Sequence, residues 1–205
     1  MDQKLHWEEV YRQKAEDAVS WFQPRPELSL DLIRASGLVP DDPIIDVGGG
    51  ASRLVDALLA AGVRDITVLD IADAALDKAR KRLGASAAQV HWLTADVTHW
   101  RPERKYRLWH DRAVFHFLTE AADRAAYRHA LESALAPGAT AIIASFAPDG
   151  PERCSGLPVQ RYSPDTLAAE LGPAFQLIDR RDEEHMTPAS KVQRFQYSVF
   201  RFQPG

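Results

Sequence analysis

The stretch that decides the fold is Ile44-Ile45-Asp46-Val47-Gly48-Gly49-Gly50-Ala51-Ser52. Its apolar start predicts a short buried strand, which runs into three consecutive glycines. Residues 51–60 then predict a helix, because their leucine and valine side chains fall on one helical face. Glycines at such a turn let the backbone approach a ligand closely, and ligands of parallel α/β sheets bind beyond the carboxyl ends of the strands. We therefore expect a ligand site at this turn.

Strands and helices alternate after the glycine turn. Further strands are predicted over residues 66–69, 90–93, 106–110 and 140–146, and further helices over residues 74–83, 120–135 and 164–171. This alternation predicts a doubly wound α/β sheet. Two more β-rich stretches, 175–180 and 195–202, are separated by about fifteen residues, too few for a helical crossover, so they should pair antiparallel. The expected fold is a mostly parallel, seven-stranded sheet with a C-terminal antiparallel hairpin.

The first forty residues predict a helical arm in front of this Rossmann-like core. One helix is expected around residues 5–11 and a second over residues 27–36, with a proline-bounded loop between them. In that loop Trp21 and Phe22 either form a lid over the ligand or pin the arm to the core. We expect a single domain over residues 1–205, with the arm at 1–40 and the core at 41–205.

Composition excludes several classes of protein. The 205 residues include 25 basic and 29 acidic side chains, a net charge of -4, so there is no basic excess of the kind that nucleic-acid binding uses, and no nucleic-acid partner is expected. A single cysteine, Cys154, excludes an internal disulfide, and the seven histidines lack metal-ligand spacing, so no metal is expected. Residues 139–147, the longest apolar run, reach about half the ~20 residues of a membrane helix. These features favour a cytoplasmic protein without a membrane partner.

Three aspartates stand at the carboxyl ends of successive predicted strands. Asp46 precedes the glycines by two positions, where a carboxylate would repel a pyrophosphate and attract an ammonium group. The sixth position of a dinucleotide fingerprint would be Arg53 rather than glycine, and no phosphate-loop lysine follows. Asp70 lies where an acid accepts both ribose hydroxyls, and Asp96 where a carboxylate accepts an adenine amino proton. Alternatively, each acid is a solvated strand end.

The pattern Asp46-x-Gly48-x-Gly50, together with Asp70, Asp96 and the hairpin, resembles the class I S-adenosylmethionine-dependent methyltransferases. The resemblance covers roughly residues 40–205. It implies S-adenosyl-L-methionine as cofactor and S-adenosyl-L-homocysteine as product. The implied cofactor-binding residues are Asp46, Gly48 and Gly50 for the methionine moiety, Asp70 with Ile71 for the ribose, Asp96 with Val97 for the adenine, and Trp21 as a lid. Ser52 replaces a third glycine of many relatives, and its hydroxyl is expected to cap the next helix.

The predicted fourth strand ends in Asp111-Arg112-Ala113, where the reacting edge should lie. This D-R-A step is similar to the D-R-G step of thiopurine and small-thiol methyltransferases and to the D-K-G step of some protein-lysine methyltransferases. Asp111 is a candidate to orient or deprotonate an amine, and Arg112 to clamp a carboxylate. Alternatively the two form a structural ion pair. His116 is either a general base or a buried structural residue between two phenylalanines.

The function predicted on these grounds is methyl transfer by in-line displacement to a nitrogen, sulfur or oxygen of a small molecule or a protein side chain. Two alternatives remain open. One is a nicotinamide-dependent oxidoreductase on a similar sheet, which the arginine at position 53 disfavours. The other is an interaction protein that binds S-adenosylmethionine without catalysis. Nothing in the sequence indicates the oligomeric state.

Overall fold

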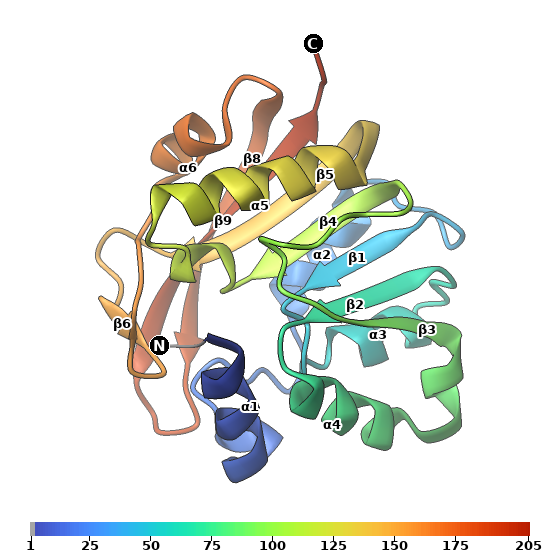
Figure 1. Ribbon diagram of the computed structural model, residues 1–205, viewed down its shortest axis with the longest axis vertical. Coiled ribbons are helices and arrows are strands. Elements are labelled where there is room, and N and C mark those ends of the chain that lie inside the picture. Colours follow the sequence, from blue (N-terminus) through green and yellow to red (C-terminus); the bar gives the residue numbers. More distant parts are fainter. Residues whose placement is uncertain (1–2) are drawn as a thin grey trace.

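A seven-stranded sheet forms the centre of the computed structural model, which describes residues 3–205. The strand order is β3-β2-β1-β4-β5-β9-β8, with β1 to β5 parallel and the pairs β5–β9 and β8–β9 antiparallel. The strands are β1 (Ile44–Val47), β2 (Ile66–Asp70), β3 (Val90–Thr94), β4 (Tyr106–Arg112), β5 (Leu135–Phe146), β8 (Phe175–Met186) and β9 (Val192–Phe202). The predicted α/β class, the mostly parallel sheet and its C-terminal antiparallel pair are confirmed (Figure 1).

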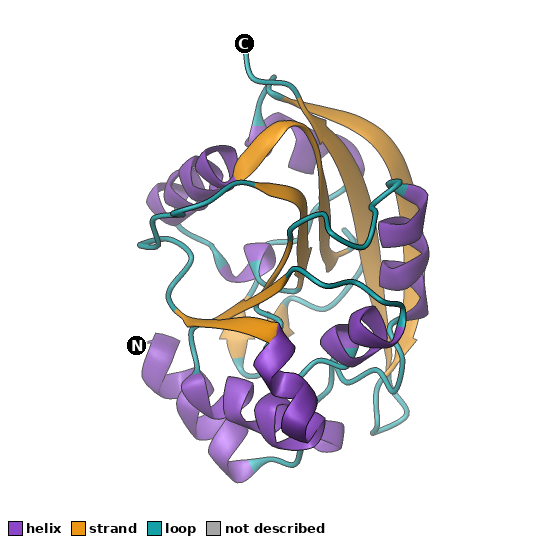
Figure 2. Cartoon of the chain, turned by 90° about the vertical axis from the view of Figure 1, so that its right-hand side faces the viewer, coloured by secondary structure: helices purple, strands orange, loops and turns teal. Residues whose placement is uncertain are grey.

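Helices cover both faces of the sheet (Figure 2). They are α1 (Gln3–Gln13), α2 (Glu27–Ala35), α3 (Leu54–Ala60), α4 (Asp73–Leu83), α5 (Ala121–Ala134) and α6 (Pro164–Leu171), with short 3-10 turns η1 (Glu16–Ala18), η2 (Gly84–Gln89) and η3 (Phe115–Phe117). Successive strand residues point to opposite faces. Ile45 and Trp109 therefore join the core beneath α5 and α6, whereas Ile44 and Leu108 join the core beneath α2 and α3.

The last two strands are longer than the sequence predicts. They reach Met186 and begin again at Val192, so residues 187–191 alone connect them and the expected interval of about fifteen residues is wrong. Residues 181–184 of that interval are all charged, which β8 tolerates because it is the edge of the sheet, and Arg194 on β9 pairs with Glu184 on β8 at 3.1 Å. A small hairpin, β6 (Arg153–Cys154) with β7 (Leu157–Pro158), was also not predicted.

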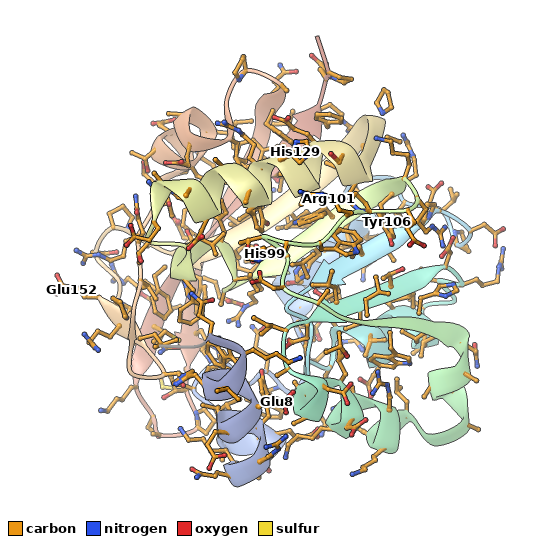
Figure 3. The ribbon with its side chains drawn as sticks, viewed as in Figure 1. Glu8, His99, Arg101, Tyr106, His129 and Glu152 are labelled. Atoms are coloured by element: carbon orange, nitrogen blue, oxygen red, sulfur yellow. The ribbon has the colours of Figure 1, made fainter. Side chains whose placement is uncertain are left out.

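The N-terminal arm is helical, as predicted, and α1 lies beside α4 (Figure 1). Glu8 on α1 points toward α4, where its Oε1 accepts a hydrogen bond of 2.8 Å from the backbone N–H of Asp73 (Figure 3). A carboxylate is favourable at this first turn of a helix, where backbone N–H groups lack partners. The contact fixes α1 over the end of the sheet that carries the glycine turn. Within residues 3–205, no helix has the length and apolar character needed to span a membrane.

Candidate functional site

The glycine turn holds two carboxylates so closely that no side chain fits beside them. A Cβ atom on Gly49 would lie 2.5 Å from Oδ2 of Asp46, and one on Gly50 would lie 2.7 Å from Oδ2 of Asp70. Gly48 and Gly50 also have positive φ angles of 67° and 40°, which other residues rarely adopt. The three glycines therefore form a tight cradle, packed against Val114 at Gly48 and against two acidic side chains at Gly49 and Gly50.

The cavity that contains most of the predicted cofactor residues, which we call the main cavity, lies between the strand ends and the N-terminal arm. Its floor includes Gly48 of the turn, Asp70 and Ile71 after β2, and Asp96 and Val97 after β3. The predicted residues Trp21, Gly48, Asp70, Ile71, Asp96 and Val97 thus share one cavity. Asp46 and Ser52 line a second cavity, and Gly50 lines neither. The second cavity adjoins the turn on its other side and shares Tyr11, Trp21, Gly48 and Arg112 with the first.

Asp70 is a buried carboxylate without a cationic partner among the described hydrogen bonds. Its Oδ1 accepts a hydrogen bond of 2.8 Å from the N–H of Ala72, whereas Oδ2 faces the turn at Gly50. Burial raises the pKa of Asp70 to about 7, and the nearby charges of Asp46 and Glu8 act in the same direction. Such a carboxylate gains most from a ligand that donates hydroxyl protons.

Asp96 is more exposed than Asp70, and both of its carboxylate oxygens have hydrogen-bond partners. Its Oδ1 accepts hydrogen bonds from the backbone N–H and the hydroxyl of Thr98, at 2.9 and 2.7 Å, and its Oδ2 lies 2.9 Å from Nδ1 of His99. Burial alone would raise the pKa of Asp96, but the hydrogen bonds from Thr98 and His99 lower it. The carboxylate is thereby fixed beside Val97 at the β3 end of the main cavity.

Asp111 is placed inside the protein and does not line either cavity. Its carboxylate accepts hydrogen bonds from the backbone N–H groups of Val114 and Phe115 and, at 2.6 Å, from the hydroxyl of Tyr127. Burial raises its pKa to about 6. These contacts hold the turn after β4 against α5, so the structure gives Asp111 a structural position and does not bring it to a substrate.

Arg112 lines both cavities, but its ion-pair partner is Glu183 rather than Asp111. The guanidinium donates from Nε to the hydroxyl of Tyr197 at 2.9 Å, from Nη1 to the carbonyl of Trp21 at 3.2 Å, and from Nη2 to Glu183 at 3.1 Å. An arginine has five N–H donors, so two remain for a ligand. The predicted ion pair of neighbouring residues 111 and 112 is not formed.

His116 lies behind this edge, fully buried and outside the walls of both cavities. Its ring packs against Phe117 and Phe146 at centroid distances of 4.5 and 4.8 Å, and Nε2 has no partner among the described residues. Burial and the charge of Arg112 lower its pKa to about 3. A histidine with this pKa is a weak base at neutral pH, so the geometry favours the structural alternative over the catalytic one.

Aromatic side chains form the wall of the main cavity that faces the arm. Trp7 meets Trp21 at 5.6 Å and Phe117 at 5.1 Å, both edge to face, and Tyr11 lies beside Trp21. Cys154 of the β6–β7 hairpin lines the same cavity, and burial raises its thiol pKa to about 11, so it is a neutral thiol. Of these, only Trp21 was predicted from the sequence to bind the cofactor. Trp7 and Tyr11 are four residues apart, one helical turn, so both lie on one face of α1.

The second cavity contains polar residues that were not predicted from the sequence. Ser29 on α2 and His110 on β4 line it together with Asp46, and Nδ1 of His110 lies 2.7 Å from Oδ1 of Asp46. Asp46 and His110 are direct neighbours in the parallel register of β1 and β4. Pairing of these two strands places both side chains on one face, which a sequence pattern alone does not specify.

Ser52 has a local role at the start of α3. Its Oγ accepts a hydrogen bond of 3.1 Å from the N–H of Leu54, the first helical residue, while Ser52 itself closes the glycine turn through its N–H to Gly49. The helix therefore begins at residue 54 instead of residue 51. Arg53 next to it pairs with Glu16 of the arm.

Residues 44–138 match a family model described as a methyltransferase domain. The chain is similar to the eEF1A lysine and N-terminal methyltransferase of Mus musculus, with 26% identity over 93 residues, which is 45% of this chain and 13% of that protein. The homologue in Drosophila melanogaster is 29% identical over 93 residues, 45% of this chain and 14% of that protein. The chain thus aligns with only a small part of these relatives.

Solved methyltransferase structures share the fold over nearly the whole chain. One from Anabaena variabilis has a TM-score of 0.77 at 14% identity and covers 99% of this chain and 96% of that one. The 1,6-didemethyltoxoflavin-N1-methyltransferase of Burkholderia thailandensis, with bound S-adenosylhomocysteine, has a TM-score of 0.73 at 19% identity, covering 98% of this chain and 88% of that one. Residues 44–138 thus match a methyltransferase domain, and the whole chain has the fold of solved S-adenosylmethionine-dependent methyltransferases.

Proposed function

We propose that this protein is an enzyme that transfers the methyl group of S-adenosyl-L-methionine to a nitrogen, sulfur or oxygen atom of a small molecule or a protein side chain. The observation that carries the proposal is the buried carboxylate of Asp70, whose Oδ2 faces the glycine cradle. The net charge of -4 favours acceptors other than nucleic acid. A cytoplasmic location stays a prediction.

The residues around the main cavity fit the adenosine part of this cofactor. Asp70 and Ile71 would hold the ribose, since the carboxylate of Asp70 suits two hydroxyl donors. Asp96 and Val97 would hold the adenine, with a fixed acceptor beside an apolar surface. Trp21 would cover the site from the arm side.

The second cavity fits the amino-acid part of the cofactor. Asp46 offers a carboxylate to an ammonium group, and Arg112 offers its two remaining N–H donors to a carboxylate. The turn at Gly48 and Gly50 would let the chain between the two ends pass close to the backbone. On this assignment Arg112 binds the cofactor, and the carboxylate clamp predicted for a substrate serves the cofactor instead.

Bound S-adenosylmethionine supplies an electrophilic methyl group on a sulfonium. The protein's part in an in-line displacement is to position the acceptor and exclude water. Trp7, Trp21 and Phe117 form an apolar wall for the acceptor side, and Cys154 closes it. No histidine is among the described residues that line the main cavity. We therefore propose catalysis by positioning, with an acceptor that arrives deprotonated.

Incubation with methyl-labelled cofactor and a cell extract tests this activity. The labelled extract is separated into protein and small-molecule fractions, and Asp70→Ala serves as the matched variant because it removes the proposed ribose contact. Enzyme-dependent label in either fraction, greatly reduced in the variant, is the expected result, and the labelled fraction identifies the acceptor class. Label in neither fraction, across extracts that contain both proteins and metabolites, would contradict the proposal.

A further inference from the structure

A continuous chain of polar side chains crosses the interior from Arg112 to Asp46. The Nε atom of Arg112 donates to the hydroxyl of Tyr197 at 2.9 Å, and that hydroxyl lies 3.4 Å from Oγ of Ser29. Oγ of Ser29 is 2.9 Å from Nε2 of His110, whose Nδ1 is 2.7 Å from Oδ1 of Asp46. Ser29 and Tyr197 are fully buried, and Asp46 and His110 are each 3% exposed.

The protons along this chain have one consistent arrangement. The carboxylate of Asp46 only accepts, so Nδ1 of His110 carries the proton between them. The hydroxyl of Ser29 then donates to Nε2, the other ring nitrogen. Ser29 and His110 therefore donate in the direction of Asp46, whereas the single proton of the Tyr197 hydroxyl is directed to Oε2 of Glu183 at 3.4 Å. The Tyr197 oxygen, which accepts from Arg112 and lies 3.4 Å from Ser29, stands between the two ends.

The two oxygens of Asp46 have separate surroundings. Oδ1 is held by His110, whereas Oδ2 lies against the glycine turn, 2.5 Å from where a Cβ atom on Gly49 would be. No described hydrogen bond ends on Oδ2. The hydrogen bond from His110 thus fixes the rotation of the carboxyl group and leaves one oxygen facing the cradle.

We propose that His110 and Ser29 are positioning residues for the cofactor's amino-acid end. His110 orients Asp46 so that Oδ2 meets the ammonium group, and Ser29 fixes the His110 tautomer that makes this possible. The inference rests on the proposed function, because it assumes that the amino-acid part of S-adenosylmethionine occupies the second cavity. A buried charge-assisted hydrogen bond of this kind contributes more than a neutral one, since the low dielectric strengthens it.

The spacing of Ser29, His110 and Asp46 is also that of a serine nucleophile with its base and acid. The surroundings favour positioning instead, because the hydroxyl of Ser29 is fully buried and Tyr197 lies 3.4 Å from it. A nucleophile would need an exposed face for a carbonyl carbon. Acylation of Ser29 by an activated ester would therefore contradict the positioning role, and the experiment below tests it.

Calorimetric titration of the whole chain with two probes tests the proposal. S-Adenosylhomocysteine carries the amino-acid end, and 5′-methylthioadenosine lacks it. We expect His110→Phe to weaken binding of S-adenosylhomocysteine by about tenfold or more, in line with the loss of a hydrogen bond to a charged group. Binding of 5′-methylthioadenosine should stay within about twofold of wild type. His110→Asn, which keeps an N–H donor toward Asp46, should restore part of the loss.

Three controls keep the result interpretable. His129→Phe makes the same change at an exposed position on α5, remote from the cavities, and should alter neither affinity (Figure 3). Ser29→Ala is the milder second variant if His110→Phe fails to fold, and it should weaken S-adenosylhomocysteine alone by about threefold or more. Wild type that binds neither probe would refute the proposed function itself.

Three results would overturn the inference while the proposed function stands. The first is an equal loss of both probes in the His110 and Ser29 variants, which would indicate a general structural defect. The second is unchanged binding of S-adenosylhomocysteine in folded variants. The third is a burst of product from p-nitrophenyl acetate that Ser29→Ala abolishes, which would make Ser29 a nucleophile.

Discussion

The hydroxyl of Tyr127 on α5 donates a hydrogen bond of 2.6 Å to the carboxylate of Asp111 at the end of β4. The same hydroxyl accepts a hydrogen bond of 2.9 Å from the indole N–H of Trp109. Two residues of one strand are thereby tied to one helix through a single buried oxygen. This explains why Asp111, which the sequence suggests as a residue that orients or deprotonates an amine, is held away from both cavities.

We expect Asp111→Asn to destabilise the fold. The amide can accept only one of the two backbone hydrogen bonds from Val114 and Phe115, and its NH2 group faces a donor. Loss of a buried charge-assisted hydrogen bond costs about 2–3 kcal/mol, measurable by urea unfolding. The exposed Asp31→Asn, which breaks only a surface pair with Arg34, should change stability by less than about 1 kcal/mol. If Asp111→Asn has wild-type stability but no methyl transfer, Asp111 takes part in the reaction.

Asp70 should make both stability and cofactor affinity depend on pH. Its pKa is raised from 3.8 to about 7 by burial, so the folded chain binds more protons than the unfolded chain between these values. The contribution of Asp70 to stability is therefore fully present below about pH 4 and falls as the pH rises toward 7. Asparagine does not ionise, so Asp70→Asn should not lose stability as the pH rises. The melting temperature of Asp70→Asn should therefore exceed that of wild type at pH 8 and approach the wild-type value at pH 4. Scanning calorimetry at several pH values measures the difference.

The affinity for the cofactor should increase as the pH rises, whereas the contribution of Asp70 to stability decreases. The ionised carboxylate is the better acceptor for ribose hydroxyls, so the affinity of wild type for S-adenosylhomocysteine should rise from pH 6 to pH 8 by several-fold. Asp70→Asn should bind more weakly, with little pH dependence over this range. A variant with the wild-type affinity and pH profile would remove Asp70 from the ribose site.

Gly49→Ala should weaken cofactor binding through one added methyl group. Its Cβ would lie 2.5 Å from Oδ2 of Asp46 and 2.8 Å from the side chain of Val68, so the carboxylate must leave its position. Titration with S-adenosylhomocysteine should show a loss of at least about tenfold. Gly84→Ala is the control, because its φ of 56° makes alanine costly by about 1 kcal/mol while open space surrounds it. Gly84→Ala should lose stability and keep its affinity for S-adenosylhomocysteine. Wild-type affinity in Gly49→Ala, with weakened affinity in Gly84→Ala, would contradict the role of the glycine cradle.

His116→Phe should retain methyl transfer. The ring packs between Phe117 and Phe146. The change removes Nε2, which has no partner among the described residues, and Nδ1, which accepts only a long hydrogen bond of 3.4 Å from the N–H of Phe146. Replacing an unsatisfied polar group by an apolar one of similar shape is close to neutral or stabilising. Turnover and urea unfolding are the two measurements. A large drop in turnover with unchanged cofactor affinity would show that His116 takes part in the reaction after all.

Local sequence patterns were sufficient for the sheet and for the residues at its strand ends. The apolar runs at Ile44 and Ile66 have nothing polar to expose, so they must be inner strands, and the acids that follow must lie at one edge. The length of β8 was missed because its charged residues are tolerated only on an edge strand, and a sequence does not show which strand is the edge.

The sequence alone does not indicate which polar side chains pair with one another. Arg112 follows Asp111 in the chain, yet it pairs with Glu183, 71 positions away, because side chains of adjacent strand residues point to opposite faces. The same alternation places His110 beside Asp46 and Asp111 toward α5. Such pairings depend on strand order and register, which only the folded chain specifies.

The measurement that tests the central claim most directly is a calorimetric titration of the purified chain with S-adenosylhomocysteine, with NAD as the comparison ligand. We predict saturable binding at one site per chain, weakened by Asp70→Ala, and no binding of NAD. Saturating ligand at about 100 times its Kd should also add about 2.7 kcal/mol to stability, a rise of about 5–10 °C in melting temperature. Absence of both the binding heat and the melting shift, or stabilisation by NAD alone, would contradict the assignment of a methyltransferase cofactor site.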